Sequence, residues 1–316
     1  MERPQDNAGR NWVIMNSLGI YEKALPSDLS WTEKFNLVKE LGFNFLEFSI
    51  DESDEKLARL DWTREERAEF RNAMWETNSR INTMMLSGHR RFPLGSTDPY
   101  IRHQSLVMMQ KAVDLAVDLG IRNIQMAGYD VYYEGKSVNT RELYVENLEK
   151  CVEMAEKKDV MLSIETMDDP FINSLADIAH YKTQVRSPWL QSYPDLGNLS
   201  AWPENNVAQD LENNIDNIVA VHLKDTLPVT ATSKGQFKNV PFGQGCVDFE
   251  GCLRTLKRLN YSGSFTIEMW SGSDINPIAE VKAAKLFFED LFAKVGLEQE
   301  PVDDILNKDY GGKLHA

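Results

Sequence analysis

The sequence contains no long apolar run, few cysteines and no concentrated block of basic residues. No apolar stretch reaches the roughly 18 residues that a membrane-spanning helix requires, and the first residues, MERPQDNAGRNW, lack the apolar centre of a signal peptide. The three cysteines, Cys151, Cys246 and Cys252, are odd in number and have no CxxC spacing, which argues against a disulfide framework or a structural zinc cluster. We therefore expect a cytoplasmic protein without a membrane partner.

The charge balance is strongly acidic. With 49 Asp and Glu against 34 Lys and Arg, the formal net charge is −15. Such a field repels phosphate backbones, so we expect no nucleic-acid partner, although one or two local cations can still hold a small phosphate. A hydrophobic content of 42% and a charged content of 26% are ordinary for a soluble globular enzyme.

Strand-like apolar segments alternate with amphipathic helical segments along the whole chain. We count eight predicted strands, at residues 12–21, 43–50, 81–88, 121–128, 160–166, 190–197, 218–225 and 263–270. No proline- or glycine-rich linker separates the strand–helix units. This pattern predicts a parallel, eight-stranded (β/α)8 TIM barrel formed by a single domain over residues 1–316, with a Rossmann-like open sheet as the alternative. We expect residues 1–12 and 297–316 to form short tails outside the barrel.

Helix boundaries are marked by side chains that cap the first turn. Ser30 and Thr63 each precede a glutamate by three residues, as in the capping box, and Asp98 precedes a proline. Asp248 is expected to begin a helix in the same way, and Gly120 to end one. Before Gly120, apolar residues recur every three or four positions and predict one face packed on the sheet: Val113, Ala116, Val117 and Leu119.

Four residues of metal-ligand type lie toward the carboxyl ends of four consecutive predicted strands: Glu165, Asp195, His222 and Glu268. In a parallel barrel these ends converge at the mouth, where three buried carboxylates would repel each other unless a cation neutralised them. Three carboxylates and one imidazole suit Mn²⁺ or Mg²⁺ and tolerate Zn²⁺ or Co²⁺. Taken singly, each carboxylate could equally be a helix cap or a rim residue, and His222 a core histidine; the combination predicts a divalent metal site.

Longer stretches of the chain resemble a known family. They include LGIYEKALP (18–26), SGHRRFPLGS (87–96), YPDLGNLSAW (193–202), VAVHLKDT (219–226), NVPFGQG (239–245) and IEMW (267–270). These are similar to the sugar-phosphate 3-epimerases that act on L-xylulose 5-phosphate and L-ribulose 5-phosphate, within the xylose-isomerase-like barrel superfamily. The chain departs from the family's pattern in its extra residues before Trp12 and in Gln244, where relatives often have a glutamate.

The resemblance implies a metal-dependent isomerase that interconverts these two phosphorylated ketopentoses by removing a proton at C3 through an enediolate. It implies that Glu165, Asp195, His222 and Glu268 bind the metal, that Glu165 and Glu268 also move protons, and that the protein is a homodimer.

Further residues near the predicted strand ends are candidate substrate contacts: Glu47, His89, Asn198 and Lys224. Each has a structural alternative, such as an internal ion pair for Glu47, a rim salt bridge for Lys224 or a turn-shaping role for Asn198. Candidate phosphate contacts are Arg90, Arg91 and the backbone amides of residues 271–273. Trp189, Trp202 and Trp270 could wall the pocket or simply pack.

Three other functions compete with this reading. An aldose–ketose isomerase would share the metal and the enediolate but act between C1 and C2. A zinc endonuclease or phosphodiesterase would need more histidines than the five present, of which His103 and His180 fall in predicted helices and His315 in a tail. A catalytically silent sugar-binding barrel would be expected to lack one of the two glutamates, Glu165 and Glu268.

Overall fold

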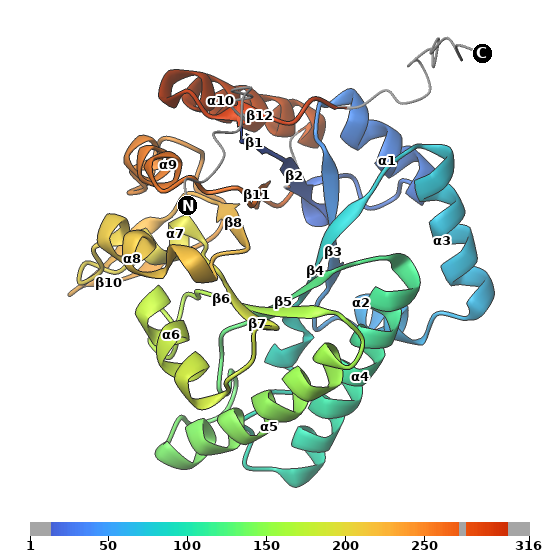
Figure 1. Ribbon diagram of the computed structural model, residues 1–316, viewed down its shortest axis with the longest axis vertical. Coiled ribbons are helices and arrows are strands. Elements are labelled where there is room, and N and C mark those ends of the chain that lie inside the picture. Colours follow the sequence, from blue (N-terminus) through green and yellow to red (C-terminus); the bar gives the residue numbers. More distant parts are fainter. Residues whose placement is uncertain (1–13, 272–275, 303–316) are drawn as a thin grey trace, which may run out of the picture.

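The computed structural model describes residues 14–271 and 276–302. Eight parallel strands form one sheet in the order β7-β6-β5-β4-β3-β2-β11-β8, and isolated bridges between Ser192 and Ile218 and between Asp195 and His222 join its two ends. The predicted (β/α)8 barrel is therefore confirmed, and the open sheet is not (Figure 1). The strands are β2 (Leu18–Tyr21), β3 (Phe45–Ile50), β4 (Ile81–Leu86), β5 (Asn123–Ala127), β6 (Met161–Glu165), β7 (Leu190–Tyr193), β8 (Ala220–Leu223) and β11 (Ser264–Ile267).

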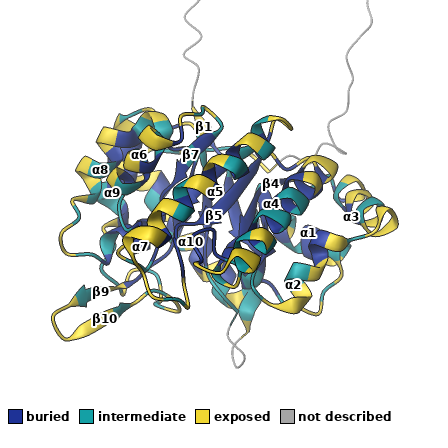
Figure 2. Ribbon diagram, turned by 90° about the horizontal axis from the view of Figure 1, so that it is seen from below, coloured by how far each residue is buried: buried dark blue, intermediate teal, exposed yellow. Residues whose placement is uncertain are grey.

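Helices cover the outside of the barrel, so that the strands are buried and the outer helix faces are exposed (Figure 2). They are α1 (Trp31–Glu40), α2 (Asp54–Ala58), α3 (Arg64–Glu76), α4 (Pro99–Leu119), α5 (Val138–Glu156), α6 (Leu175–Gln184), α7 (Leu196–Ser200), α8 (Val207–Asn214), α9 (Phe249–Arg258) and α10 (Pro277–Val295). None of the helices in the described part of the chain combines the length and apolarity needed to span a membrane.

The predicted helix boundaries hold. Ser30 and Thr63 each form a capping box, Asp98 and Asp248 cap α4 and α9, and Gly120 ends α4 in the left-handed conformation at φ 73°. The prediction for Val117 is wrong, because its side chain is exposed while Val113, Ala116 and Leu119 are buried. The apolar pattern of α4 is wider than the face that the sheet covers.

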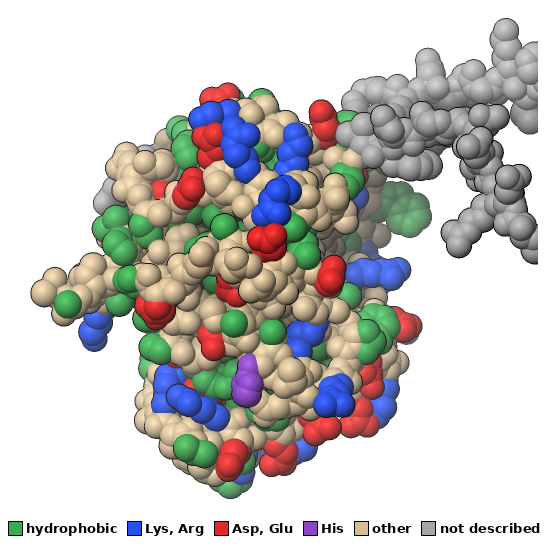
Figure 3. All heavy atoms as spheres, turned by 60° about the vertical axis from the view of Figure 1, so that its left-hand side comes forward, with side chains coloured by type: hydrophobic (Ala, Val, Ile, Leu, Met, Phe, Trp, Pro, Cys, Tyr) green, Lys and Arg blue, Asp and Glu red, His purple; other side chains and the backbone are tan. Residues whose placement is uncertain are grey.

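Short elements complete the fold. Within residues 14–271 and 276–302, the 3₁₀ helices are η1 (Glu22–Ala24), η2 (Arg59–Asp61), η3 (Ser87–Arg90) and η4 (Ile215–Asn217). The antiparallel hairpin of β9 (Leu227–Thr230) and β10 (Ser233–Gln236) follows β8. Figure 3 shows this hairpin projecting from the body of the molecule, on a face where acidic and basic side chains are interspersed.

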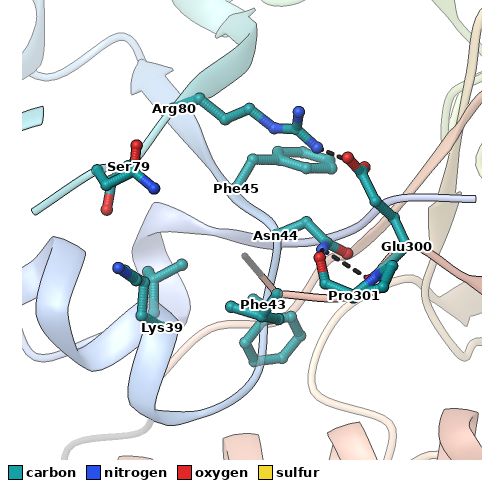
Figure 4. Close-up of a pocket in the computed structure, with 11 residues that line it drawn as sticks. Lys39, Phe43, Asn44, Phe45, Ser79, Arg80, Glu300 and Pro301 are labelled. Atoms are coloured by element: carbon teal, nitrogen blue, oxygen red, sulfur yellow. Dashed lines mark hydrogen bonds and ion pairs between the residues drawn. The ribbon is translucent and has the colours of Figure 1, made fainter. Parts of the chain in front are cut away.

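A small two-stranded sheet lies at the amino-terminal end of β2, where β1 (Met15–Asn16) pairs with β12 (Glu298–Gln299). Next to it, Arg80 forms an ion pair of 2.5 Å with Glu300, and the Asn44 amide donates to the Glu300 carbonyl at 2.9 Å (Figure 4). Residues 298–300, at the start of the expected carboxyl-terminal tail, thus contact the barrel through these bonds. Residues 1–12 and 303–316 of the expected tails lie outside the described residues.

Strand register determines which side chains share a level inside the barrel. Glu47 on β3 is level with Tyr21 on β2, Glu165 on β6 is level with Tyr193 on β7, and His222 on β8 is next to Thr266 on β11. At the opposite end of β2, Gly19 lies against the Phe45 ring so closely that a Cβ atom there would overlap it. The carboxyl ends of the strands thus bring several polar residues to one end of a tightly packed barrel.

Candidate metal centre

The four predicted ligands meet at the carboxyl end of the barrel. Glu165 ends β6, Asp195 follows β7 by two residues, His222 lies within β8, and Glu268 immediately follows β11. One candidate donor atom from each residue lies within 4.8 Å of the other three, and all four residues are buried. Neighbouring strands of a parallel barrel bring together residues that are separated by up to about a hundred positions in sequence.

His222 lies at the centre of this cluster. Its Nδ1 atom is 2.8 Å from Glu165 Oε1 and 3.8 Å from both Asp195 Oδ2 and Glu268 Oε2. Asp195 also caps α7, because its Oδ1 atom accepts the Asn198 amide at 2.6 Å. Its other oxygen, Oδ2, is buried and accepts no hydrogen bond. A buried carboxylate oxygen without a hydrogen-bond donor is costly unless a charge compensates it.

Lys224 supplies part of that compensation. Its ammonium lies 2.7 Å from Glu268 Oε2 and 3.1 Å from Asp195 Oδ2. Burial raises the pKa of Asp195 to about 8 against the opposing charge of Lys224, and burial also raises the pKa of Glu165. For Glu268 burial acts in the same direction, but Lys224 and His222 outweigh it and lower the pKa to about 2.

The donor set fits a divalent cation. Three carboxylates compete for one ammonium and one imidazole in a buried space, and Asp195 Oδ2 in particular lacks a hydrogen bond. Oxygen donors with one nitrogen suit Mn²⁺ or Mg²⁺ and tolerate Zn²⁺ or Co²⁺. The cluster is consistent with a divalent metal site that Glu165, Asp195, His222 and Glu268 would form.

A cavity of about 450 Å³, open solvent at its mouth included, adjoins the cluster. Both Glu165 and Glu268 line it, as do Asn198 and Lys224 among the predicted substrate contacts. Four basic side chains are part of its lining: Lys23, Arg90, Lys224 and Lys238. These four side chains place positive charge at the mouth of the cavity, although the net charge of the chain is −15.

The two other predicted substrate contacts do not line this cavity. Glu47 is fully buried behind His222, with its Oε2 atom 2.7 Å from His222 Nε2 and its Oε1 atom accepting the Tyr193 hydroxyl at 2.8 Å. His89, in η3, is 2% exposed, and burial lowers its pKa to about 4. Neither side chain lies at the cavity surface, because both point into the protein interior from elements whose ends reach the mouth.

Of the two arginines predicted to contact phosphate, only one lines the cavity. Arg90 lines the cavity with its guanidinium 5.5 Å from the centroids of both the Tyr129 and Tyr132 rings, whereas Arg91 is exposed and pairs with Asp54 at 2.5 Å. The Ser271 amide already donates to the Lys23 carbonyl at 3.0 Å. Residues 272 and 273 lie outside the described residues.

Of the three tryptophans considered as pocket walls, one lines the cavity and two do not. Trp270 lines the cavity, with Lys238 5.1 Å from its ring centroid. Trp202 is not part of the lining and donates its ring N–H to the Met167 carbonyl at 3.4 Å. Trp189 directly precedes β7, so it lies toward the other end of the barrel and cannot wall this pocket.

Some cavity residues were not identified from the sequence. Lys23 follows β2 by two residues, so the rule that strand ends carry the site could have found it. Lys238 gave no such signal, because the β9–β10 hairpin separates it from β8. The loop after the hairpin is held by Asp225, whose Oδ2 atom accepts the amides of Gly243 and Gly245, both at 2.9 Å. These hydrogen bonds give a structural role to Asp225, the aspartate of the stretch VAVHLKDT (219–226).

Comparisons with known proteins agree with this arrangement. The family described as "Xylose isomerase-like TIM barrel" matches residues 35–291. A protein from Haemophilus influenzae named "Putative L-ribulose-5-phosphate 3-epimerase SgbU" is 49% identical over 282 residues, covering 89% of this chain and 98% of the relative. "L-ribulose-5-phosphate 3-epimerase UlaE" of Escherichia coli O157:H7 is 50% identical over 280 residues, covering 89% and 96%.

More distant solved structures share the fold. The apo form of 3-keto-D-glucoside 4-epimerase YcjR from E. coli has a TM-score of 0.69 at 20% identity, covering 87% of this chain and 99% of that one. A xylose isomerase-like TIM barrel protein from Mycobacterium smegmatis, in complex with magnesium, has a TM-score of 0.66 at 16% identity, covering 88% and 97%.

Proposed function

We propose, on the premise that this chain belongs to the L-ribulose-5-phosphate 3-epimerase family of xylose isomerase-like TIM barrels, that it interconverts L-ribulose 5-phosphate and L-xylulose 5-phosphate. The observation that carries the proposal is the cluster of Glu165, Asp195, His222 and Glu268 beside a cavity that both glutamates line. We further propose a homodimer, for which the family resemblance is the only support.

The four clustered residues would hold a divalent cation, with Mn²⁺ or Mg²⁺ preferred by the donor set. When bound, such a cation polarises the C2 carbonyl of a 2-ketose and favours the enediolate that forms when C3 loses its proton. Lys224, between Asp195 and Glu268, adds a fixed positive charge to the same wall of the cavity.

Epimerisation at C3 needs one group that removes a proton and a second that returns a proton to the other face. Glu165 and Glu268 meet this need, because they come from β6 and β11, which are separated around the barrel by β7 and β8. A ketose bound between them would present one face of C3 to each carboxylate. By reversibility, each glutamate acts as the base for one epimer and as the acid for the other.

The basic residues of the mouth support a phosphorylated substrate. Lys23, Arg90, Lys224 and Lys238 line one cavity, although acidic residues predominate in the chain as a whole. Ammonium and guanidinium groups form charge-assisted hydrogen bonds to phosphate, which are stronger than neutral ones. Asn198, whose amide nitrogen donates to the Thr166 carbonyl at 2.7 Å, would turn its remaining amide oxygen to a sugar hydroxyl.

The test is an exchange experiment in heavy water. The protein is incubated with L-ribulose 5-phosphate and Mg²⁺, with and without a chelator, and the sugars are followed by NMR. The proposal predicts deuterium at C3 together with L-xylulose 5-phosphate, both abolished by the chelator. Deuterium at C1 would instead indicate an aldose–ketose isomerase, and no exchange would indicate a sugar-binding barrel. Glu165→Gln and Glu268→Gln should each abolish the formation of L-xylulose 5-phosphate while leaving the circular dichroism spectrum unchanged.

A further inference from the structure

Glu47 occupies the barrel interior directly behind His222. It lies on β3, far from β8 in sequence, and its side chain is fully buried and absent from the cavity lining. Its Oε2 atom lies 2.7 Å from His222 Nε2, and its Oε1 atom accepts the hydroxyl hydrogen of Tyr193 at 2.8 Å. Both carboxylate oxygens are therefore committed to neighbours, and neither reaches a substrate.

The two nitrogens of His222 face different groups. Nδ1 faces the cluster, with Glu165, Asp195 and Glu268 oxygens at 2.8–3.8 Å, whereas Nε2 faces only the Glu47 carboxylate among the acidic groups of the described residues. A neutral imidazole carries its hydrogen on one nitrogen and a lone pair on the other. A carboxylate that accepts from Nε2 keeps the hydrogen there and leaves the Nδ1 lone pair free for a cation.

We propose that Glu47 is a positioning residue, which fixes the ring orientation and tautomer of His222 so that Nδ1 binds the divalent cation. The inference rests on the proposed cation site. Tyr193 holds Glu47 in turn, because its hydroxyl bonds to Oε1 and its ring meets the His222 ring edge-on at a centroid distance of 4.6 Å. An ionised carboxylate can only accept from Nε2, whereas a neutral amide in its place could either accept from Nε2 or donate to it, so it would no longer fix which nitrogen carries the hydrogen.

Cation affinity separates this role from simple packing. Calorimetric titration with Mn²⁺ compares the wild type, Glu47→Gln, which keeps the side-chain volume, and Tyr193→Phe, which removes the other hydrogen bond to Glu47. We expect Glu47→Gln to weaken Mn²⁺ binding about 10- to 100-fold and Tyr193→Phe about threefold at most. Circular dichroism spectra and apo melting temperatures report separately on the fold.

If Glu47→Gln binds Mn²⁺ within about twofold of the wild type, Glu47 does not position the ligand and the inference is wrong. If the wild type itself binds no Mn²⁺, the proposed cation site fails as well, so the two failures are distinguishable.

A measurement on the wild type covers the case in which Glu47→Gln does not fold. Protein labelled with ¹⁵N-histidine is loaded with Zn²⁺, and the His222 signals are identified by their loss in His222→Gln. The inference predicts a hydrogen on Nε2 and none on Nδ1. A hydrogen on Nδ1 would overturn it, whatever the behaviour of the variants.

Discussion

Replacing Glu22 by Gln should destabilise the protein strongly, because Glu22 anchors the loop that brings Lys23 to the cavity. The Glu22 carboxylate is buried in η1 and accepts two hydrogen bonds from Arg59, both at 2.7 Å, and one from Lys56 at 2.6 Å. Burial alone would raise the pKa of Glu22, but Arg59 and Lys56 outweigh it and lower the pKa to about 2.

The magnitude follows from this pKa. A fall from the ordinary value of 4.5 to about 2 corresponds to about 3 kcal/mol of stabilisation of the ionised form. Solvent screens this ion pair only weakly, because the Glu22 and Arg59 side chains are only 1% and 8% exposed, so the stabilisation is not reduced much. The glutamine variant should therefore lose about 3 kcal/mol of unfolding free energy at pH 7, within the range found when one partner of a buried ion pair is removed.

Urea unfolding followed by circular dichroism measures this difference. Because the pKa of Glu22 is lowered in the folded state, its contribution is present above pH 4.5 and is lost as the pH falls toward 2. The difference in unfolding free energy between the wild type and Glu22→Gln should thus stay constant from pH 7 to 5 and become smaller below pH 4.5. Glu55→Gln is the matched control, since Glu55 is 82% exposed and 3.9 Å from Lys56. A difference in unfolding free energy below about 1 kcal/mol at pH 7, or a difference that grows as the pH falls, would contradict the role given to the Glu22 ion pairs.

Three further predictions concern packing, protonation and substrate binding. Gly19→Ala should lose about 1–3 kcal/mol of unfolding free energy in urea, because the added methyl group would overlap the Phe45 ring. His89 is held neutral by burial with a pKa of about 4, so its protonation favours the unfolded chain; between pH 6.5 and 4 the wild type should lose about 3 kcal/mol more stability than His89→Gln. Equal acid sensitivity of the two proteins would contradict this. Lys238→Ala should raise KM for L-ribulose 5-phosphate about tenfold while changing kcat little, as expected for the loss of one charge-assisted contact to phosphate. An unchanged KM in steady-state kinetics would remove Lys238 from the phosphate contacts.

The sequence predicted the barrel and its four clustered residues for a common physical reason. Strands buried on both faces are nearly continuous apolar runs, so a polar residue at the carboxyl end of such a run is conspicuous, as with Glu165 and His222. The pairing of β1 with β12 was missed, because two-residue strands leave no periodic pattern. Val117 was misassigned because spacing indicates a helix face but not how much of that face the sheet covers.

Contacts across the barrel interior could not be read from the sequence. The position of Glu47 within an apolar strand was plain, but its partner His222 is fixed by barrel closure and strand register. His89 is similar, because a strand-end position does not say whether the side chain turns to the mouth or to the helices. Lys238 reaches the cavity only through the loop after the hairpin, whose course depends on Asp225.

The central claim is that one divalent cation is bound jointly by Glu165, Asp195, His222 and Glu268. Anomalous diffraction from crystals soaked in Mn²⁺ tests it directly, because the anomalous signal locates the ion independently of any activity. We predict a single strong peak at the carboxyl end of the barrel, in contact with a carboxylate oxygen from each acidic residue and with His222 Nδ1. A peak elsewhere, or one that touches two or fewer of the four side chains, would contradict the account.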